Sequence, residues 1–193
     1  MSSAALREMT ADEFLAWDLA QDGKHEFVDG LVVRMMTGTK RVHDRITVNV
    51  IATLRSQLRG SGCTPHTDDL AVRTAINRVR RPDVLVDCDP GDRDDLEAAA
   101  PRAVFEVLSP STRVIDMVGK RDEYRHVETI EHVVLIDPDR CDVRVSSREG
   151  GAWTSERLRE LDAVLRLPAI GAELPLATIY EDVALAPDDT PIE

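Results

Sequence analysis

Arg81-Pro82-Asp83-Val84-Leu85-Val86 and Val104-Phe105-Glu106-Val107-Leu108 are two short apolar runs, and each contains one carboxylate. Runs of this length and composition, bounded by polar loops, are typical of buried β-strands. A charged group inside a buried strand destabilises the fold unless it is paired or binds a metal. The two runs therefore predict central strands that need a cation between them, and Lys120 follows soon after in a helical segment.

The spacing of the two carboxylates allows them to meet. Successive residues of a strand face opposite sides, so Asp83 shares a side with Leu85, and Glu106 shares a side with Val104. If the strands are neighbours, the two carboxylates lie side by side and raise each other's pKa unless a cation neutralises them. Mg²⁺ prefers one or two carboxylates with waters and phosphate oxygens, and the Val107 carbonyl is a further candidate ligand. The alternative is two edge-strand carboxylates that face solvent or pair with arginine.

Length and composition indicate one globular domain. The chain has 193 residues, of which 42% are hydrophobic and 31% charged, and we expect a single domain over 1–184 with a flexible tail over 185–193. No apolar run approaches the roughly 20 residues that span a bilayer. The N-terminus has no signal-peptide pattern, which favours a cytoplasmic protein whose three separated cysteines (Cys63, Cys88, Cys141) are reduced thiols.

Charge is unevenly distributed along the chain. The formal net charge of −12 argues against a nucleic-acid partner. Residues 34–81, however, hold ten Lys or Arg against three acids, a net of +7. This basic section is either a phosphate-facing surface beside an acidic metal site or a set of charges balanced by acids elsewhere in the fold.

Local patterns predict the elements around the central strands. Thr10 and Glu13 form a capping box for a helix over 11–20, and Asp29-Gly30 between apolar runs predicts a hairpin over 24–35. Apolar residues at four-residue spacing predict a helix over 40–59. The acidic loop from Asp87 lacks the glycine and glutamate positions of a calcium loop.

The rest of the chain, from residue 62 onward, is predicted to contain both strands and helices. We expect strands at 62–67, 70–75, 82–87, 102–108, 131–137, 141–146, 152–160 and 163–167, and helices at 112–127 and 176–180. Asp116, Lys120 and Tyr124 recur every four residues and so share one face of the first of these helices. Helices and strands that mix without strict alternation favour an α/β (α+β) domain with a mixed sheet.

Several of these pieces occur together in one known family. The sequence resembles the Uma-two restriction endonuclease family, a branch of the PD-(D/E)XK nuclease superfamily. The resemblance rests on the order and spacing of motifs between Glu26 and Pro138: His25 to Gly30, His43, Arg81 to Val84, Phe105 to Thr112, Asp116 to Tyr124, and Asp137-Pro138. The Pro-Asp pair alone would carry no weight, whereas the whole series is specific.

The resemblance implies a restriction-endonuclease-like central mixed β-sheet flanked by helices, and Mg²⁺-dependent hydrolysis of DNA, with Mn²⁺ able to substitute. Asp83 and Glu106 match the two metal-binding acids. Leu108 stands where the superfamily usually has its lysine, and Lys120 matches a lysine moved to the following helix, where it would orient the attacking water. Glu26 matches an upstream acid that binds metal through water or holds Lys120.

Alternatives remain open at the level of function. The missing lysine at Leu108 and the charge of −12 are also compatible with a catalytically inactive interaction or nucleic-acid-binding module. The motif does not separate DNA from RNA or branched DNA. Cutting two strands generally needs two active sites, which favours a homodimer. His43 and Tyr124 are more simply structural, and Ser109, Ser111 and Thr112 are either helix caps or phosphate contacts.

Overall fold

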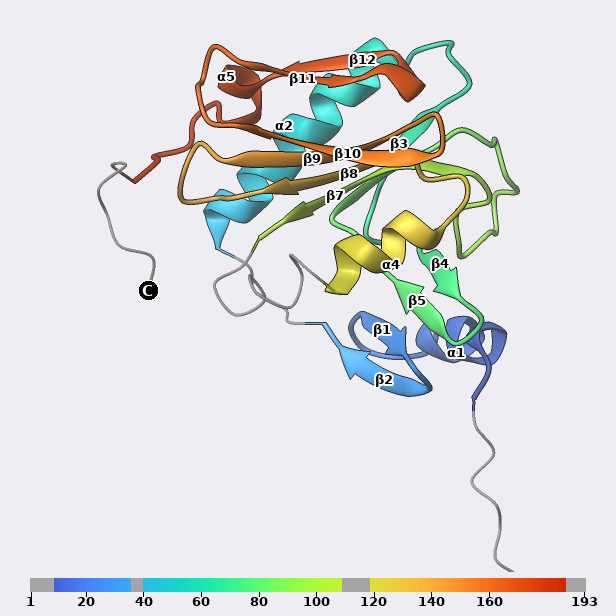
Figure 1. The fold of residues 1–193 in the computed structure, drawn as a ribbon. Coiled ribbons are helices and arrows are strands. Elements are labelled where there is room, and N and C mark those ends of the chain that lie inside the picture. Colours follow the sequence, from blue (N-terminus) through green and yellow to red (C-terminus); the bar gives the residue numbers. More distant parts are fainter. Residues whose placement is uncertain (1–8, 36–39, 109–118, 187–193) are drawn as a thin grey trace, which may run out of the picture.

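A six-stranded sheet forms the centre of the protein. The computed structural model describes residues 9–35, 40–108 and 119–186, and the strand order of this sheet is β10-β9-β8-β7-β6-β3 (Figure 1). Only β7 and β8 pair in parallel, so the sheet is mixed as predicted. Its strands are β3 (Thr64–Thr67), β6 (Val84–Asp87), β7 (Pro101–Val107), β8 (His132–Ile136), β9 (Val143–Glu149) and β10 (Ala152–Leu158).

Helix α2 (Arg41–Gln57) covers one face of this sheet. Its buried residues Ile46, Val50 and Leu54 recur every four positions and pack with Phe105 and other apolar side chains of the central strands. The C-terminal elements complete the same core cluster. They are β11 (Val164–Leu167), the 3₁₀ helix η2 (Pro168–Ile170), β12 (Ala172–Pro175) and α5 (Leu176–Ile179).

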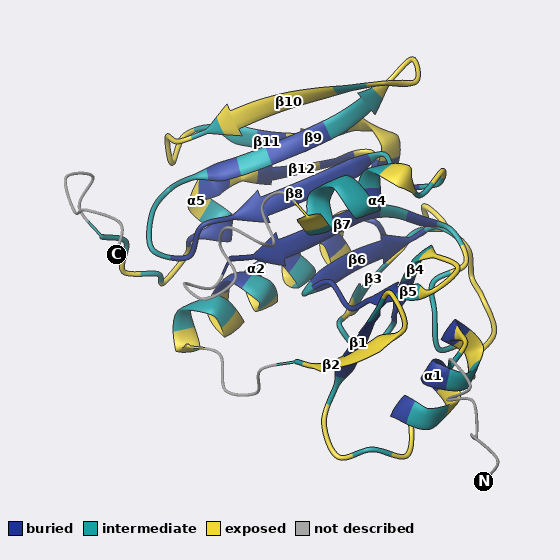
Figure 2. Cartoon of the chain, turned by 60° about the horizontal axis from the view of Figure 1, so that its bottom comes forward, coloured by how far each residue is buried: buried dark blue, intermediate teal, exposed yellow. Residues whose placement is uncertain are grey.

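Within the part of the chain that the structure describes, the opposite face is covered only in part, by the short helix α4 (Arg121–His126) (Figure 2). Tyr124 of this helix is fully buried and belongs to a cluster with Leu85, Val104 and Val133. The same face carries Asp83 and Glu106, because side chains on a strand alternate. The residues predicted to form the site therefore lie beside α4, on the side of the sheet away from α2.

A second, four-stranded sheet lies beside α4 with the order β2-β1-β5-β4. Its strands are β1 (His25–Val28), β2 (Leu31–Arg34), β4 (Val72–Ala75) and β5 (Arg78–Arg80). Helix α1 (Ala11–Asp18) packs on β1 through Phe14 and Phe27, whose rings stack 5.1 Å apart. Asp29 and Gly30 both have positive φ at the hairpin turn, as the sequence predicted.

Strands β5 and β12 were not predicted. Val79 is the only apolar residue in Arg78–Arg80, and β12 is the short segment just before α5. Strand β6 begins at Val84, so Asp83 lies just before the strand and not inside it.

The predicted helix over 112–127 falls partly outside the described residues. Its described part is helical, with Gly119 and Lys120 in π-helical conformation followed by α4. Near the C-terminus, Leu185 packs on the core.

The prediction of three reduced thiols is wrong for two of them. Cys63 and Cys88 form a disulfide, whereas Cys141 is free. The two bonded residues directly flank the β3–β6 pair, in which Thr64 is the partner of Asp87. An antiparallel register thus brings together residues that are 25 positions apart, which the spacing of cysteines alone does not reveal.

Among the described residues, no helix is long and apolar enough to cross a membrane.

His132 provides a test of the packing between β8 and η2. It is 1% exposed, its Nδ1 hydrogen-bonds the Ser147 hydroxyl, and its Nε2 accepts the Ala169 N–H at 3.2 Å. Burial lowers the pKa of His132 to about 4. The folded state therefore holds a neutral ring, and its stabilising contribution is complete above the unfolded pKa of about 6.5 and is lost progressively below it.

We expect acidification from about pH 6.5 to about pH 5 to lower the free energy of unfolding by about 2 kcal/mol through this one residue. Urea unfolding of the wild type and of His132→Gln at both pH values checks this. The variant should lose less stability on acidification, and the exposed control His126→Gln should behave as the wild type. Equal acid sensitivity of all three proteins would contradict the assignment.

Candidate functional site

Asp83 and Glu106 lie opposite each other at the ends of two neighbouring strands. Strands β6 and β7 are antiparallel, and the pairing of Val84 with Phe105 extends to place Asp83 across from Glu106. One oxygen of Asp83, Oδ2, accepts the Val107 N–H at 2.7 Å. That hydrogen bond fixes the orientation of the carboxylate, and the structure thus brings together all three residues predicted as metal ligands.

Glu106 is buried among like charges. It is 6% exposed, and its Oε1 accepts a hydrogen bond from the Tyr124 hydroxyl at 2.7 Å. Burial raises its pKa, Lys120 opposes that effect, and the charges of Asp83 and Glu26 add to it, so the pKa is about 8. A carboxyl with such a pKa gains much from a nearby cation. Tyr124 is therefore both a core residue and the hydrogen-bond donor that orients Glu106.

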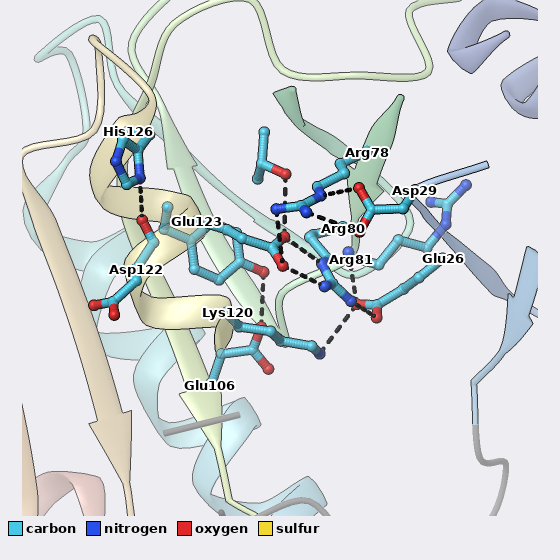
Figure 3. Close-up of polar contacts among 12 residues, drawn as sticks. Glu26, Asp29, Arg78, Arg80, Arg81, Glu106, Lys120, Asp122, Glu123 and His126 are labelled. Atoms are coloured by element: carbon cyan, nitrogen blue, oxygen red, sulfur yellow. Dashed lines mark hydrogen bonds and ion pairs between the residues drawn. The ribbon is translucent and has the colours of Figure 1, made fainter. Parts of the chain in front are cut away.

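Lys120 meets Glu26 from a different part of the chain. Its Nζ lies 3.0 Å from Oε1 of Glu26 and 3.6 Å from Oε1 of Glu106, and its side chain is 13% exposed (Figure 3). Asp116, which the sequence places on the same helix face as Lys120, lies outside the described residues. Glu26 comes from β1 and Lys120 from the helical residues just before α4, so this ion pair joins the four-stranded sheet to the segment that leads into α4, and Lys120 also reaches Glu106 of β7.

Glu26 is itself held by two consecutive arginines. Its Oε2 pairs with Nη1 of Arg80 at 2.9 Å, and its Oε1 accepts the backbone N–H of Arg81 at 3.3 Å. Burial raises the pKa of Glu26, but the charges of Lys120 and Arg80 outweigh it and the net pKa is lowered. Glu26 is thus ionised and positions Lys120, which is one of the two roles the family resemblance implied.

Arg80 and Arg81 continue this network in opposite directions. Arg80 also forms a bidentate pair with Glu123 of α4, at 2.6 and 2.8 Å. Arg81 pairs with Asp18 of α1 at 2.7 Å and donates to the backbone carbonyls of His25, Asp68 and Asp69. These contacts lie immediately before Pro82-Asp83 and fix the chain that carries the first acid.

The basic section 34–81 is therefore balanced by acids at its C-terminal end, where four of its ten basic residues lie. Arg73 pairs with Glu97 and Asp12, Arg78 with Asp29, and the two following arginines with the acids just described. The charges of these four arginines are thus balanced by acids elsewhere in the fold, and the four residues do not form a phosphate-facing surface. Lys40, Arg41 and Arg45 are exposed at the start of α2.

His43 belongs to the site, although sequence reasoning set it aside. Its Nε2 lies 3.2 Å from Oδ1 of Asp83, and its ring also hydrogen-bonds the backbone of Val107. Burial lowers the pKa of His43, but these hydrogen bonds and the Asp83 charge raise it above its ordinary value. The signal was present, because His43 lies three residues before Ile46 and therefore on the buried stripe of α2.

The donor set fits a hard divalent cation. Over residues 9–35, 40–108 and 119–186, no three His, Cys, Asp or Glu side chains already converge as ligands of one ion. Two carboxylates and one main-chain carbonyl suit Mg²⁺, which completes its shell with waters and phosphate oxygens. Burial is the largest cause of the raised pKa of Glu106, and the charges of Asp83 and Glu26 add to it, so a cation bound here would favour the ionised carboxylate. Asp83, Glu106 and Val107 therefore fit such an ion.

Other candidates have simpler outcomes. Leu108 is 5% exposed and its N–H donates to the Ile136 carbonyl, so an apolar side chain occupies the position of the usual superfamily lysine. The candidate phosphate contacts Ser109, Ser111 and Thr112 lie outside the described residues.

Comparisons with known proteins agree with this architecture. The model of the Uma2 family, described as "Putative restriction endonuclease", matches residues 11–178. The Uncharacterized protein slr1290 of Synechocystis sp. is 30% identical over 185 residues, which cover 94% of this chain and 96% of that protein. The crystal structure of a "putative nuclease belonging to DUF820" from Anabaena variabilis matches with a TM-score of 0.69 at 19% identity, covering 91% of this chain and 99% of that one.

The mixed sheet, its flanking helices and the structural match define an α/β protein with the fold of that Anabaena structure, as the sequence predicted. The family match spans most of the chain, and the protein belongs to the Uma2 restriction endonuclease family.

The contact between Lys120 and Glu26 yields a measurable coupling. Lys120→Met leaves two buried carboxylates without their shared cation, so we expect it to lower the free energy of unfolding by about 3 kcal/mol. Adding Glu26→Gln should recover part of this loss, with a coupling energy of about 1–3 kcal/mol in a double-mutant cycle. Lys40→Met removes an exposed lysine and is the matched control. If both lysine variants were equally stable, the buried ion pair would not exist in solution.

Proposed function

We propose that the protein is a metal-dependent endonuclease that hydrolyses phosphodiester bonds of DNA. The observation that carries the proposal is the placement of Asp83 beside Glu106, next to a lysine that Glu26 holds in place. Two neighbouring acids that can share a metal ion, with a buried lysine beside them, are groups that metal-dependent phosphodiester hydrolysis uses. The family description supports the same reaction class.

The residues divide the work between them. Asp83, Glu106 and the Val107 carbonyl would hold Mg²⁺, or Mn²⁺ in its place, and the ion would supply Lewis-acid polarisation of the phosphate and an acidified water. Lys120 would orient the attacking water and offset the charge that develops on the phosphoryl oxygens. Glu26 and Arg80 limit the positions that the lysine can occupy. Tyr124 keeps one oxygen of Glu106 directed toward α4.

A second candidate function has its own support. Lys120 pairs with both Glu26 and Glu106, and the Tyr124 hydroxyl also donates to Glu106. An inactive nuclease fold could retain such a cluster for stability alone, in a module that binds nucleic acid or protein without cutting. This alternative predicts that Asp83 and Glu106 do not bind a divalent ion. Cleavage of RNA or of branched DNA is a variant of the first proposal. The first proposal also includes a homodimer, because cutting two DNA strands generally needs two active sites, and a location in the cytoplasm.

We expect Asp83→Asn and Glu106→Gln each to reduce Mg²⁺- or Mn²⁺-dependent nicking of supercoiled plasmid by at least about 100-fold, because each removes a ligand charge. Both substitutions keep the shape of the side chain, so circular dichroism should report an intact fold. Asp94→Asn, at an acid whose side chain is 89% exposed, is the control and should cut as the wild type. Equal nicking by all four proteins would sink the assignment of the site.

Calorimetry separates the two candidate functions. Titration with Mn²⁺ should give specific heat of binding for the wild type and for Asp94→Asn, and none for the two site variants. Absence of binding to the wild type, together with absence of nicking, would favour the non-catalytic module.

A further inference from the structure

A row of residues crosses the large sheet from the candidate site to its far edge. Glu106 of β7 is the partner of Leu135 in β8, Leu135 is the partner of Arg144 in β9, and Arg144 is the partner of Arg157 in β10. Partnered residues of adjacent strands project to the same face of a sheet. The order of these four strands can be followed in Figure 1. Two arginines therefore lie in line with Glu106, on the face that α4 covers only in part.

A groove of about 270 Å³ lies along this row. Leu135, Arg144 and Arg157 line it together with Arg121, the serines Ser146 and Ser155, Val145 and Glu156. Arg121 directly follows Lys120 in the chain, and Leu135 is the cross-strand neighbour of Glu106. The groove thus begins one strand away from the candidate metal ligands and continues away from them toward β10.

The arginines of the groove are held in place and yet reachable from solvent. Arg157 pairs with both oxygens of Asp142, and Nη2 of Arg144 lies 3.6 Å from the same carboxylate. Their side chains are 42% and 39% exposed, and that of Arg121 is 32% exposed beside Asp122. A guanidinium has five N–H donors, and the pair of Arg157 with Asp142 uses two of them. Asp142 thereby pre-orients two cations across adjacent strands.

The dimensions of the row suit a chain of phosphates. Strands in a sheet lie about 4.8 Å apart, which places Arg144 about 10 Å and Arg157 about 14 Å from Glu106. Successive phosphates of one nucleic-acid strand advance by steps of comparable size. Guanidinium groups bind phosphates in a planar, two-point fashion. The hydroxyls of Ser146 and Ser155 line the same groove and hydrogen-bond each other at 3.1 Å, which leaves one of the two O–H groups to donate to a phosphate.

We propose that Arg121, Arg144 and Arg157 bind the backbone phosphates of a single DNA strand that runs across β8, β9 and β10 away from the scissile bond. This inference rests on the proposed function, since the scissile phosphate is placed at Asp83 and Glu106. It also assigns the phosphate contacts to a part of the chain that the basic section 34–81 does not include. The arginines are positioning residues and do not take part in the chemistry.

The test measures binding without cleavage. Fluorescence anisotropy with a short labelled single-stranded DNA oligonucleotide, in buffer without divalent ions, reports affinity independently of the metal site. Arg144→Gln/Arg157→Gln should weaken binding at least about 10-fold and reduce the slope of log affinity against log salt by about 1.4, the value for two lost contacts to a single strand. Arg55→Gln/Arg166→Gln changes the charge equally, at exposed positions of α2 and β11, and should leave both quantities nearly unchanged.

A variant that is expected to bind DNA more tightly controls for loss of folding, because an unfolded protein would bind more weakly. Asp142→Asn keeps both arginines and an amide oxygen that still accepts from them, while it removes the negative charge that competes with phosphate, so binding should become tighter than in the wild type. The proposal is overturned if the wild type does not bind the oligonucleotide, if the groove and control variants weaken binding equally, or if an RNA oligonucleotide alone is bound. A wild type that binds through the groove but cuts no DNA would refute the proposed function and leave this site standing.

Discussion

The ion pair between Lys120 and Glu26 is the interaction on which the arrangement of the site depends. It joins the four-stranded sheet to the segment that leads into α4, and α4 in turn covers part of the six-stranded sheet. Arg80 strengthens the same junction by pairing with Glu26 on one side and Glu123 of α4 on the other. Burial makes these charges costly when separated. The two sheets and the helix are thus held at one position by the residues that surround Glu106.

The same network of buried ion pairs explains the arginines at the end of the basic section 34–81 in an otherwise acidic protein. The arginines before Asp83 neutralise carboxylates that come from α1, β1 and α4. A net charge calculated over a stretch of sequence does not distinguish such internal partners from a surface. The groove on β8, β9 and β10 shows the opposite situation, since its arginines stand in a part of the sequence that is acidic overall.

The placement of Asp83 beside Glu106 was predictable because it depends on the alternation of side chains along two neighbouring strands. The period of two along a strand placed Asp83 and Glu106 on one face, and an antiparallel register then brought them together. The capping box at Thr10 and the Asp29-Gly30 turn are likewise local. Contacts between distant segments were harder to predict. The Cys63–Cys88 disulfide depends on the β3–β6 register, β5 contains one apolar residue, and His43 reaches Asp83 only because α2 packs on the sheet.

Arg81 extends the support of the site to the beginning of the described chain. Its guanidinium is buried and connects Asp18 at the end of α1 with three carbonyls, only two residues before Asp83. A fragment that began at β1 would keep every residue of the nuclease motif and still lose the carboxylate that balances this arginine. Helix α1 is therefore part of the smallest unit able to hold Asp83 in position. Removing α1 would displace Asp83, even though every residue of the sequence motif would remain.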